Sequence, residues 1–391
     1  MEENKNKNVK KIIIGVSIAV ATIVVVVCFV IGYNNIKLSN NQTNTTTTNG
    51  SNSSSSSKTT TSNSKNLNIT SGGSYDLSGE YESVTVNTSE EVILNLNGVE
   101  ITNSSGPAIN VEKSKKVTIA VSGTNKITAT TSEDLDGAIY SKADLVLEGT
   151  GSLEVKSNYD GIVSKDTLAI KNGTYTINSD DDGIRGKDSV EISDGTFTIN
   201  AGGDGIKASN DEDLELGYVS ITGGTYNITA KSDGIQGITK ATISGGSFNI
   251  KSAEGIEATL IKIDDGTINI EASDDGINAS KKSNIGTPTV EINGGNITIK
   301  MGQGDTDGID SNGNIYINGG TINITGNSPF DCDGTAEKNG GTIIVNGTET
   351  NTITNQMMGG GMQGEMPGQM KQNGNMPNGG EMQMNGGRRG R

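Results

Sequence analysis

The sequence predicts an all-β protein whose body is a right-handed, single-stranded parallel β-helix with coils of about 22 residues. A turn of the form Asp-Gly-Ile, or Glu-Gly-Ile at Glu254, recurs along the chain, and its shortest regular spacings are the 22 residues between Asp160, Asp182 and Asp204 and the 21 residues between Asp233, Glu254 and Asp275. Between the turns, apolar and polar residues alternate with period 2, which is the pattern of strands. Each repeat is therefore one coil, and stacked coils add length without a thicker core.

The composition agrees with this fold class. Among 391 residues there are 55 Gly and no Trp or His, and Asn, Thr, Ser and Ile are abundant. The periodic parts are too apolar for a disordered chain, and the whole is too poor in Leu and Ala for a helical one. An all-β repeat protein fits best.

Each coil is expected to contain three short strands. The phrase from Ile170 to Ile177 reads strand, Gly-containing bend, strand, and the acidic turn and a third strand around Gly-Ile follow it. We expect Gly after the acidic residue, such as Gly161, to adopt a positive φ at the corner. The Ile pairs are expected to point inward together with one further column. That column consists of Tyr175, Phe197, Tyr226, Phe248, Ile268, Ile297 and Ile322.

The chain divides into five predicted segments. They are a basic cytoplasmic stub (1–11), a transmembrane signal-anchor (12–33), a disordered linker rich in Asn, Thr and Ser (34–65), the parallel β-helix (66–355) and a disordered tail rich in Met and Gly (356–391). Within the body, the repeat is weaker up to about residue 95, so we expect an N-terminal cap there.

The membrane anchor is predicted from the uncharged run that extends from Ile12 to Tyr33. As a helix rising about 1.5 Å per residue it would span about 33 Å, enough for a bilayer core. Lysines precede the run, which predicts a cytoplasmic N-terminus and an extracellular C-terminal domain at the cell membrane. The alternatives are a cleaved signal peptide and a lipoprotein anchored through Cys28.

The linker and the tail lack the apolar residues that repay the cost of ordering a chain. The tail holds 8 of the 10 Met residues, and scattered thioethers are ligands for Cu(I). Their irregular spacing favours a flexible low-complexity segment instead.

Charge excludes one class of partner. Between residues 66 and 355 there are 42 Asp and Glu against 19 Lys and Arg, a net charge of -23. Such a surface repels phosphates and attracts cations, so nucleic acid is not an expected partner.

The acidic turns predict a metal site. In-register coils would bring their carboxylates within about 4.8 Å of one another, where they repel and raise each other's pKa. Ca2+ relieves this best, because it takes six to eight oxygen ligands. The alternative is that Asp merely suits an Asp-Gly turn, which explains one Asp per corner but not three. The predicted Ca2+ ligands are Asp160, Asp180, Asp181, Asp182, Asp204, Asp233, Asp274, Asp275, Asp305, Asp307, Asp310, Asp331 and Asp333.

Four lysines follow the acidic turns closely, namely Lys142, Lys165, Lys187 and Lys207. They either pair with the acidic column or present cations to an acidic sugar. In the second case Lys165, Lys187 and Lys207 are the candidate carbohydrate-binding residues.

The Asp-Gly-Ile turns and the Ile-x-Gly-Gly-Thr-Phe/Tyr-x-Ile phrases resemble the clostridial-type carbohydrate-binding domains, which are parallel β-helices similar to polysaccharide lyases such as pectate lyase. The resemblance covers roughly residues 66 to 355. It implies Ca2+ at the acidic turns and a polysaccharide ligand, either cellulose or an acidic pectin-like glycan.

Three functions remain open from the sequence. The first is a cell-surface, calcium-dependent polysaccharide-binding domain. The second is a calcium-dependent polysaccharide lyase, in which Lys or Arg serves as the base. Arg185 is the one Arg of the body, and no group of residues interrupts the repeat as an active site usually does. The third is a non-catalytic adhesin or spacer without a specific sugar ligand.

Overall fold

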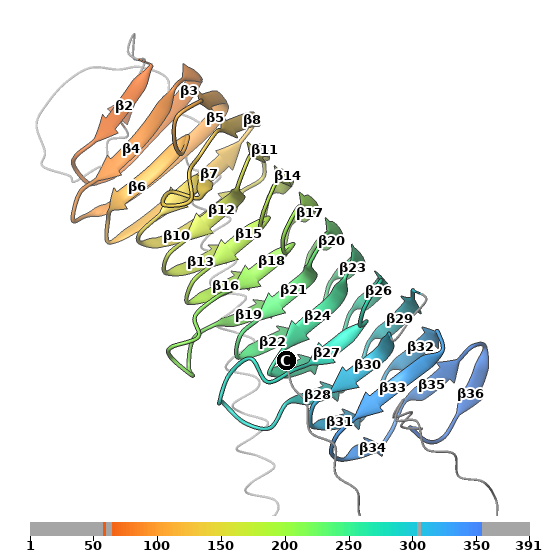
Figure 1. Ribbon diagram of the computed structural model, residues 1–391. Helices are drawn as coiled ribbons and strands as arrows, with labels where there is room; N and C mark the ends of the chain where they lie inside the picture. Colours follow the sequence, from red (N-terminus) through yellow and green to blue (C-terminus); the bar gives the residue numbers. More distant parts are fainter. Residues whose placement is uncertain (1–57, 60–64, 303–305, 354–391) are drawn as a thin grey trace, which may run out of the picture. The chain divides into compact units, whose positions relative to one another are not determined.

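The computed structural model describes residues 58–59, 65–302 and 306–353, and within these ranges every regular element is a β-strand (Figure 1). The all-β prediction is confirmed, and so is the parallel arrangement. The predicted anchor (12–33) and tail (356–391) lie outside the described residues. Within the described part of the chain, no helix is long and apolar enough to cross a membrane.

The strands form one sheet of 12 and one of 24. The 12-stranded sheet contains β2 (Asn66–Ile69), β4 (Ser83–Asn87), β6 (Ile109–Lys113), β9 (Gly137–Ser141), β12 (Asp160–Ser164), β15 (Ile184–Gly186), β18 (Ile206–Ala208), β21 (Asp233–Gly237), β24 (Glu254–Ala258), β27 (Ile277–Ala279), β30 (Asp307–Ser311) and β33 (Ser328–Cys332).

The 24-stranded sheet consists of two stacks of strands joined by the long strands β3 (Gly73–Tyr81) and β5 (Glu91–Asn103). The first stack continues through β7 (Lys116–Ser122), β10 (Asp144–Gly149), β13 (Thr167–Ile170), β16 (Ser189–Ile192), β19 (Tyr218–Ile221), β22 (Lys240–Ile243), β25 (Leu260–Ile263), β28 (Thr289–Ile292), β31 (Asn314–Ile317) and β34 (Ala336–Lys338). The second stack continues through β8 (Thr124–Ala129), β11 (Ser152–Ser157), β14 (Thr174–Ser179), β17 (Thr196–Ala201), β20 (Thr225–Ala230), β23 (Ser247–Ser252), β26 (Thr267–Ala272), β29 (Asn296–Met301), β32 (Thr321–Thr325), β35 (Thr342–Val345) and β36 (Thr348–Thr350).

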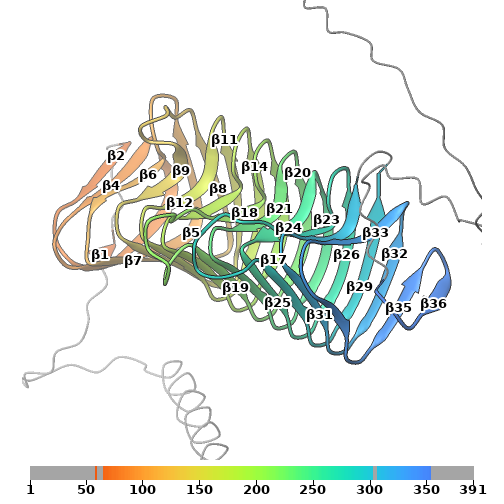
Figure 2. The same ribbon diagram turned by 60° about the horizontal axis from the view of Figure 1, so that its bottom comes forward.

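From β6 onward, each coil contributes one strand to each of the three stacks, as the repeat predicts (Figure 2). Thr174 pairs with Thr196, and Thr225 pairs with Ser247, so each residue lies beside its equivalent in the next repeat. The predicted coil length is therefore confirmed. Insertions lengthen some coils without changing the pairing register. The right-handed sense of the helix stays a prediction.

The glycines act at different places from those predicted. Most of the positive φ angles belong to the bend between the two stacks of the 24-stranded sheet, for example 123° at Gly173 and 140° at Gly195. The prediction of a positive φ after the acidic residue is wrong. At Gly161 the reason for glycine is close approach, because a Cβ would lie 2.5 Å from the carbonyl oxygen of Gly183 and 2.6 Å from Cγ2 of Ile177.

The core lies inside the coils, and its predicted aromatic column is confirmed. The rings of Tyr175, Phe197, Tyr226 and Phe248 stack face to face, with centroids 5.2, 4.8 and 4.5 Å apart in that order. All four side chains are at most 1% exposed. Parallel pairing in register places equivalent side chains of successive coils directly above one another. An aromatic residue at the same position of each coil therefore forms a continuous stack of rings.

The N-terminal end joins the parallel stacks. Within residues 66–95, Val84 pairs with Ile109, and the pairing contains register shifts in β3 and β4. That these residues act as a cap stays a prediction. Strand β1 (Lys58–Thr59) lies inside the predicted disordered linker and pairs with Tyr75 and Asp76 of β3. The open edge of β3 offers backbone partners that the linker composition does not reveal. At the other end, β36 turns back antiparallel onto β35.

The two predicted insertions are confirmed as loops outside the strands. Residues 210–216 lie between β18 and β19, and residues 281–288 lie between β27 and β28. Both leave the coil at the same bend, between the 12-stranded sheet and the first stack of the other sheet.

Candidate functional site

One face of the rod carries a continuous row of carboxylates at the start of the strands of the 12-stranded sheet. We call this row the acidic column. Its alignment follows from the pairing of Asp233 with Glu254 and from hydrogen bonds between the following glycines and the acidic residues of the next coil. Its members are Asp160, Asp182, Asp204, Asp233, Glu254, Asp275 and Asp307.

Four Asp residues of this column, Asp160, Asp182, Asp204 and Asp275, support the backbone of the next coil. The N–H of Asp182 donates to Oδ1 of Asp160 at 3.0 Å, and the N–H of Asp204 donates to Oδ1 of Asp182 at 2.8 Å. The same contact joins Asp233 to Asp204 at 2.9 Å, and Asp307 to Asp275 at 2.9 Å. One oxygen of these carboxylates is thus structural, and the other faces a neighbouring row of side chains.

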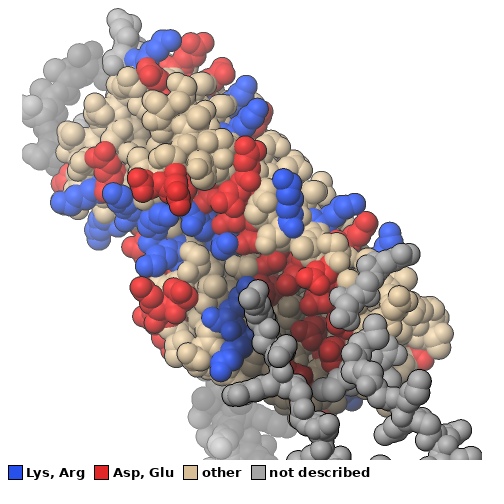
Figure 3. All heavy atoms as spheres, in the orientation of Figure 1, with Lys and Arg blue, Asp and Glu red and all other residues tan. Residues whose placement is uncertain are grey.

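That neighbouring row, which we call the adjacent column, lies three residues further along each coil. Its sequence changes from basic to acidic along the rod, because Arg185 and Lys207 stand near one end and Asp310 and Asp331 near the other. Figure 3 shows the result as acidic side chains concentrated around β24, β27 and β30. We call the surface formed by the two columns the acid-rich face. The members of the adjacent column in register are Val163, Arg185, Lys207, Gln236, Glu257, Asn278, Asp310 and Asp331.

In the N-terminal half, cations of the chain itself neutralise the acidic column. The guanidinium of Arg185 contacts Oδ2 of Asp136, lies 2.5 Å from Oδ2 of Asp160 and places Nε 3.8 Å from Asp182. The ammonium of Lys207 lies 2.7 Å from Asp204. These carboxylates therefore have charged partners without a metal ion.

In the C-terminal half, carboxylates face one another. Oxygen atoms of Asp233, Glu254 and Glu257 lie within 4.8 Å of one another. Gln236 donates to Asp233 and to Glu257, and the ammonium of Lys282 contacts Glu257. Burial, together with the neighbouring carboxylates, raises the pKa of Asp233 to about 8 and that of Glu254 to about 7.

Uncharged oxygens complete this acidic region. Asn278 is 8% exposed, and its amide donates to Glu254 at 3.2 Å while its buried Oδ1 has no hydrogen-bond partner among the described residues. Ser328 pairs with Asp307, and its buried Oγ likewise has no such partner in the described ranges. Burial and three nearby carboxylates raise the pKa of Asp310 to about 7. Carboxylates with amide and hydroxyl oxygens form a donor set that suits a hard divalent cation.

The structure separates the predicted metal ligands into groups. Six of them lie in the acidic column, namely Asp160, Asp182, Asp204, Asp233, Asp275 and Asp307. Asp310 and Asp331 belong to the adjacent column. Asp180, Asp181, Asp274 and Asp333 are exposed, and Asp305 lies outside the described residues.

Two acidic residues were missing from the predicted set, although both belong to the cluster. Glu254 occupies the turn position that Asp fills in other coils. Glu257 lies three residues later, where it pairs with Gln236 in the adjacent column. Aligning the coils and looking three residues past each turn would have found it.

The three predicted carbohydrate-binding lysines lie beside carboxylates. Lys165 is 3.1 Å from Asp136, and Lys207 is 3.4 Å from Asp182 in addition to its contact with Asp204. Lys187 lies on the exposed bend, 3.7 Å from Glu212. Pairing with carboxylates is therefore observed, and sugar binding by these lysines stays a prediction.

A second polar surface lies on the outer face of the 24-stranded sheet, over β20, β23, β26 and β29. There a hollow of about 370 Å³ is lined by outward Asn, Thr and Lys side chains. Asn227, Asn249 and Asn269 are in register, and the amide of Asn269 donates to Oδ1 of Asn249 at 3.1 Å. Beside them, Glu271 lies 3.3 Å from Lys251 and 3.9 Å from Lys300.

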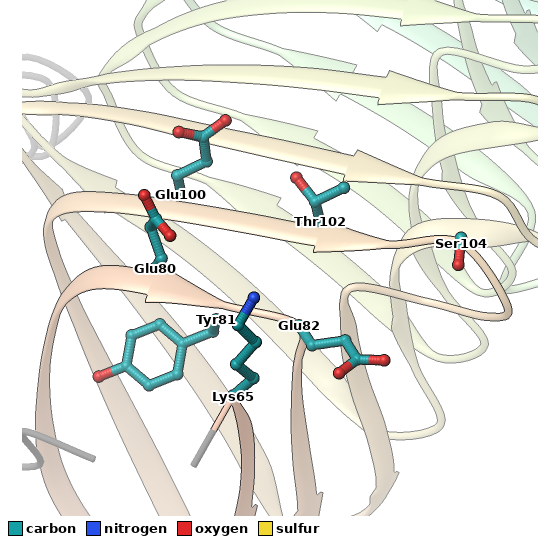
Figure 4. Close-up of a pocket in the computed structure, with 7 residues that line it drawn as sticks. All are labelled: Lys65, Glu80, Tyr81, Glu82, Glu100, Thr102 and Ser104. Atoms are coloured by element: carbon teal, nitrogen blue, oxygen red, sulfur yellow. The ribbon is translucent and has the colours of Figure 1, made fainter. Parts of the chain in front are cut away.

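A third hollow lies near the N-terminal end of the rod (Figure 4). Glu80 on β3 and Glu100 on β5 face it together with Lys65. Tyr81 also borders the hollow but is 5% exposed, so its ring offers no open face to a sugar. This hollow lacks the repeated rows of the second surface.

The sequence matches the family described as carbohydrate-binding domain-containing protein over two overlapping stretches, residues 63–308 and 254–366. A protein of the same description from Acetivibrio thermocellus is 29% identical over 124 residues, which cover 28% of this chain and 43% of that protein. The chain thus matches less than half the length of this relative.

A solved structure is also similar, namely the gadolinium derivative of the polysaccharide lyase-like protein from C. thermocellum. Its sequence is 32% identical, the match covers 54% of this chain and 89% of that chain, and the TM-score is 0.45.

Proposed function

The chain belongs to the family of carbohydrate-binding domain-containing proteins, and from this premise we propose that its β-helix is a calcium-dependent polysaccharide-binding module of the cell surface. The proposed ligands are cellulose or acidic pectin-like glycans. Family membership supports a carbohydrate as the ligand. Two surfaces of the rod support the position of the sugar site and the dependence of sugar binding on a cation.

The observation that carries the sugar site is the Asn-rich hollow over β20 to β29. Carboxamides both donate and accept hydrogen bonds, as sugar hydroxyls do. Stacked strands repeat these groups about every 4.8 Å, which suits a ligand that is itself a repeating polymer. The Lys251–Glu271–Lys300 pairs at its side are exposed, so they contribute little to stability and exchange easily for a ligand.

The cation site is proposed in the C-terminal half of the acid-rich face. Asp233, Glu254 and Glu257 would hold Ca2+ there, and Asn278 would add an uncharged oxygen. A bound Ca2+ supplies positive charge that relieves repulsion between these carboxylates and lets an acidic glycan approach an acidic protein.

Lyase activity has less support from the geometry. A β-elimination needs a base that reaches the substrate proton. The guanidinium of Arg185 is held by Asp136, Asp160 and Asp182, and its side chain is 19% exposed. Lys165 and Lys207 are paired as well, so these residues act as partners of carboxylates.

Display at the cell surface rests on the sequence alone. Residues 12–33 supply the proposed single-pass anchor, and residues 34–65 supply the spacer that carries the β-helix outside. Protease treatment of intact cells should release the β-helix, whereas a cytoplasmic domain would be protected.

Retention on insoluble polysaccharides tests the sugar site. Wild-type protein is mixed with cellulose and with polygalacturonate gel, each in Ca2+ or EDTA. We expect retention, and a loss of affinity of about tenfold or more in the variant Asn249→Ala/Asn269→Ala, because each lost hydrogen bond is worth about 1 kcal/mol.

A matched control is available on the same stack of strands. Asn200 donates to Asn178 at 3.0 Å, outside the hollow, so the variant Asn178→Ala/Asn200→Ala should bind as the wild type does. If no polysaccharide retains the wild type in either buffer, the protein is a spacer and not a binding module.

A further inference from the structure

We propose that Arg185 and Lys207 are built-in counterions of the acid-rich face. In its N-terminal half they play the role that a bound divalent cation plays in its C-terminal half. The second half of this statement rests on the cation site proposed above. The first half rests on contacts within the chain.

Arg185 joins carboxylates from three successive coils. Asp136 precedes β9, Asp160 begins β12, and Asp182 precedes β15, the strand that carries Arg185. The side chains of these three acids are 16%, 2% and 6% exposed in that order. A single guanidinium with several donors can serve several carboxylates at once, which a lysine does less well.

Lysines extend the neutralised stretch on both sides of Arg185. Lys165 contacts Asp136 at 3.1 Å, and Lys207 bridges Asp182 and Asp204 at 3.4 and 2.7 Å. Three cations thus face four carboxylates across four coils. Removing one cation from such a buried group would leave carboxylates without compensation, which is strongly unfavourable.

Beyond Lys207 the adjacent column brings no further Lys or Arg within the described residues. Gln236 and Glu257 follow in register, then Asn278, Asp310 and Asp331. The cation that contacts Glu257 is Lys282, which comes from the 281–288 insertion and not from the column. The same position of the coil therefore changes from counterion to additional carboxylate between Lys207 and Glu257.

Two consequences follow for the intact protein. Coils around β12, β15 and β18 should keep their stability when divalent cations are removed, whereas coils around β24, β27 and β30 should lose protection. Removal of Arg185 should also open a cation site, because oxygen atoms of Asp160, Asp181 and Asp182 lie within 4.8 Å of one another.

Hydrogen–deuterium exchange of the full chain, resolved by peptide, tests the inference in Ca2+ and in EDTA. In the wild type, EDTA should increase exchange around β24 to β30 and leave β12 to β18 unchanged. In Arg185→Gln, exchange around β12 and β15 should become dependent on Ca2+, and terbium luminescence should report one additional bound ion. If exchange around β12 and β15 in Arg185→Gln is as slow as in the wild type and does not depend on Ca2+, Arg185 is not a counterion.

Two further variants keep the test informative. Arg185→Lys retains the positive charge and should gain no terbium site, and Lys171→Gln removes an exposed lysine that pairs with Glu148 on another face and should change nothing. If Arg185→Gln does not fold, Lys207→Gln replaces it, with Ca2+ dependence then expected around β15 and β18. If EDTA does not change exchange around β24 to β30 in the wild type, the proposed Ca2+ site is refuted. The Arg185 variants still decide whether Arg185 acts as a counterion.

Discussion

The carboxylate of Asp182 accepts the backbone N–H of Asp204, one coil further along the rod, at 2.8 Å. The same side chain faces Lys207 with its other oxygen. An acidic turn residue therefore does two things at once, because it satisfies a buried amide of the next coil and contributes charge to the outer face. This double role explains why the turn keeps an acidic residue in so many coils.

Replacing Asp182 with Ala should lower the free energy of unfolding by about 1 to 3 kcal/mol, because the buried N–H of Asp204 loses its acceptor. Urea denaturation measures the change. The neighbouring exposed Asp180 is the control, and Asp180→Ala should stay within about 0.5 kcal/mol of the wild type. Equal stability of the two variants would contradict the structural role of the acidic column.

Replacing Phe197 with Ala should cost about 3 to 5 kcal/mol, since it leaves a cavity between the rings of Tyr175 and Tyr226. Thermal unfolding followed by circular dichroism is a suitable measurement. Thr198 comes next on β17 and points outward, so Thr198→Ala should have little effect. A small loss in Phe197→Ala would mean that the ring does not lie in the core.

Replacing Gly161 with Ala should destabilise the coil, although the φ at this position requires no glycine. The added Cβ would lie 2.5 Å from the carbonyl oxygen of Gly183, a rigid backbone atom, so the stacking of two coils must shift. Gly286→Ala is the matched control, because nothing lies within 4 Å of a Cβ there. Similar melting temperatures for the two variants would refute the close-approach argument.

Stability without metal should fall as the pH rises. Burial and neighbouring carboxylates raise the pKa of Glu254 from 4.5 to about 7 and that of Asp310 from 3.8 to about 7. A carboxyl group whose folded pKa is raised favours the folded state most when protonated, and this contribution is lost as the pH rises through about 7. In EDTA, the melting temperature should therefore be lower at pH 8 than at pH 5.

Calcium should change this pH profile, because a bound cation favours the ionised carboxylates. In excess Ca2+ the loss between pH 5 and pH 8 should shrink or reverse. A profile that is identical in Ca2+ and in EDTA would argue against a cation at the site formed by Asp233, Glu254 and Glu257.

The coil and its inward columns could be predicted from the order of the residues alone. Alternation with period 2 and one acidic turn in each repeat are enough to place Tyr175, Phe197 and their equivalents inside, because a strand has only two faces. The insertions were also predictable, since extra polar residues at a bend leave the core pattern unchanged.

The partners on the acid-rich face, by contrast, became known only from the folded chain. Arg185 meets Asp136, which lies 49 residues earlier, because the one intervening coil, that of Asp160, stacks in register between them and the long guanidinium reaches across it. The same stacking brings Glu257 to Asp233 and requires glycine at Gly161. Such contacts depend on which residues of neighbouring coils lie beside one another and on how far each side chain reaches. A repeat pattern along the sequence gives neither the spatial neighbours nor the reach of the side chains.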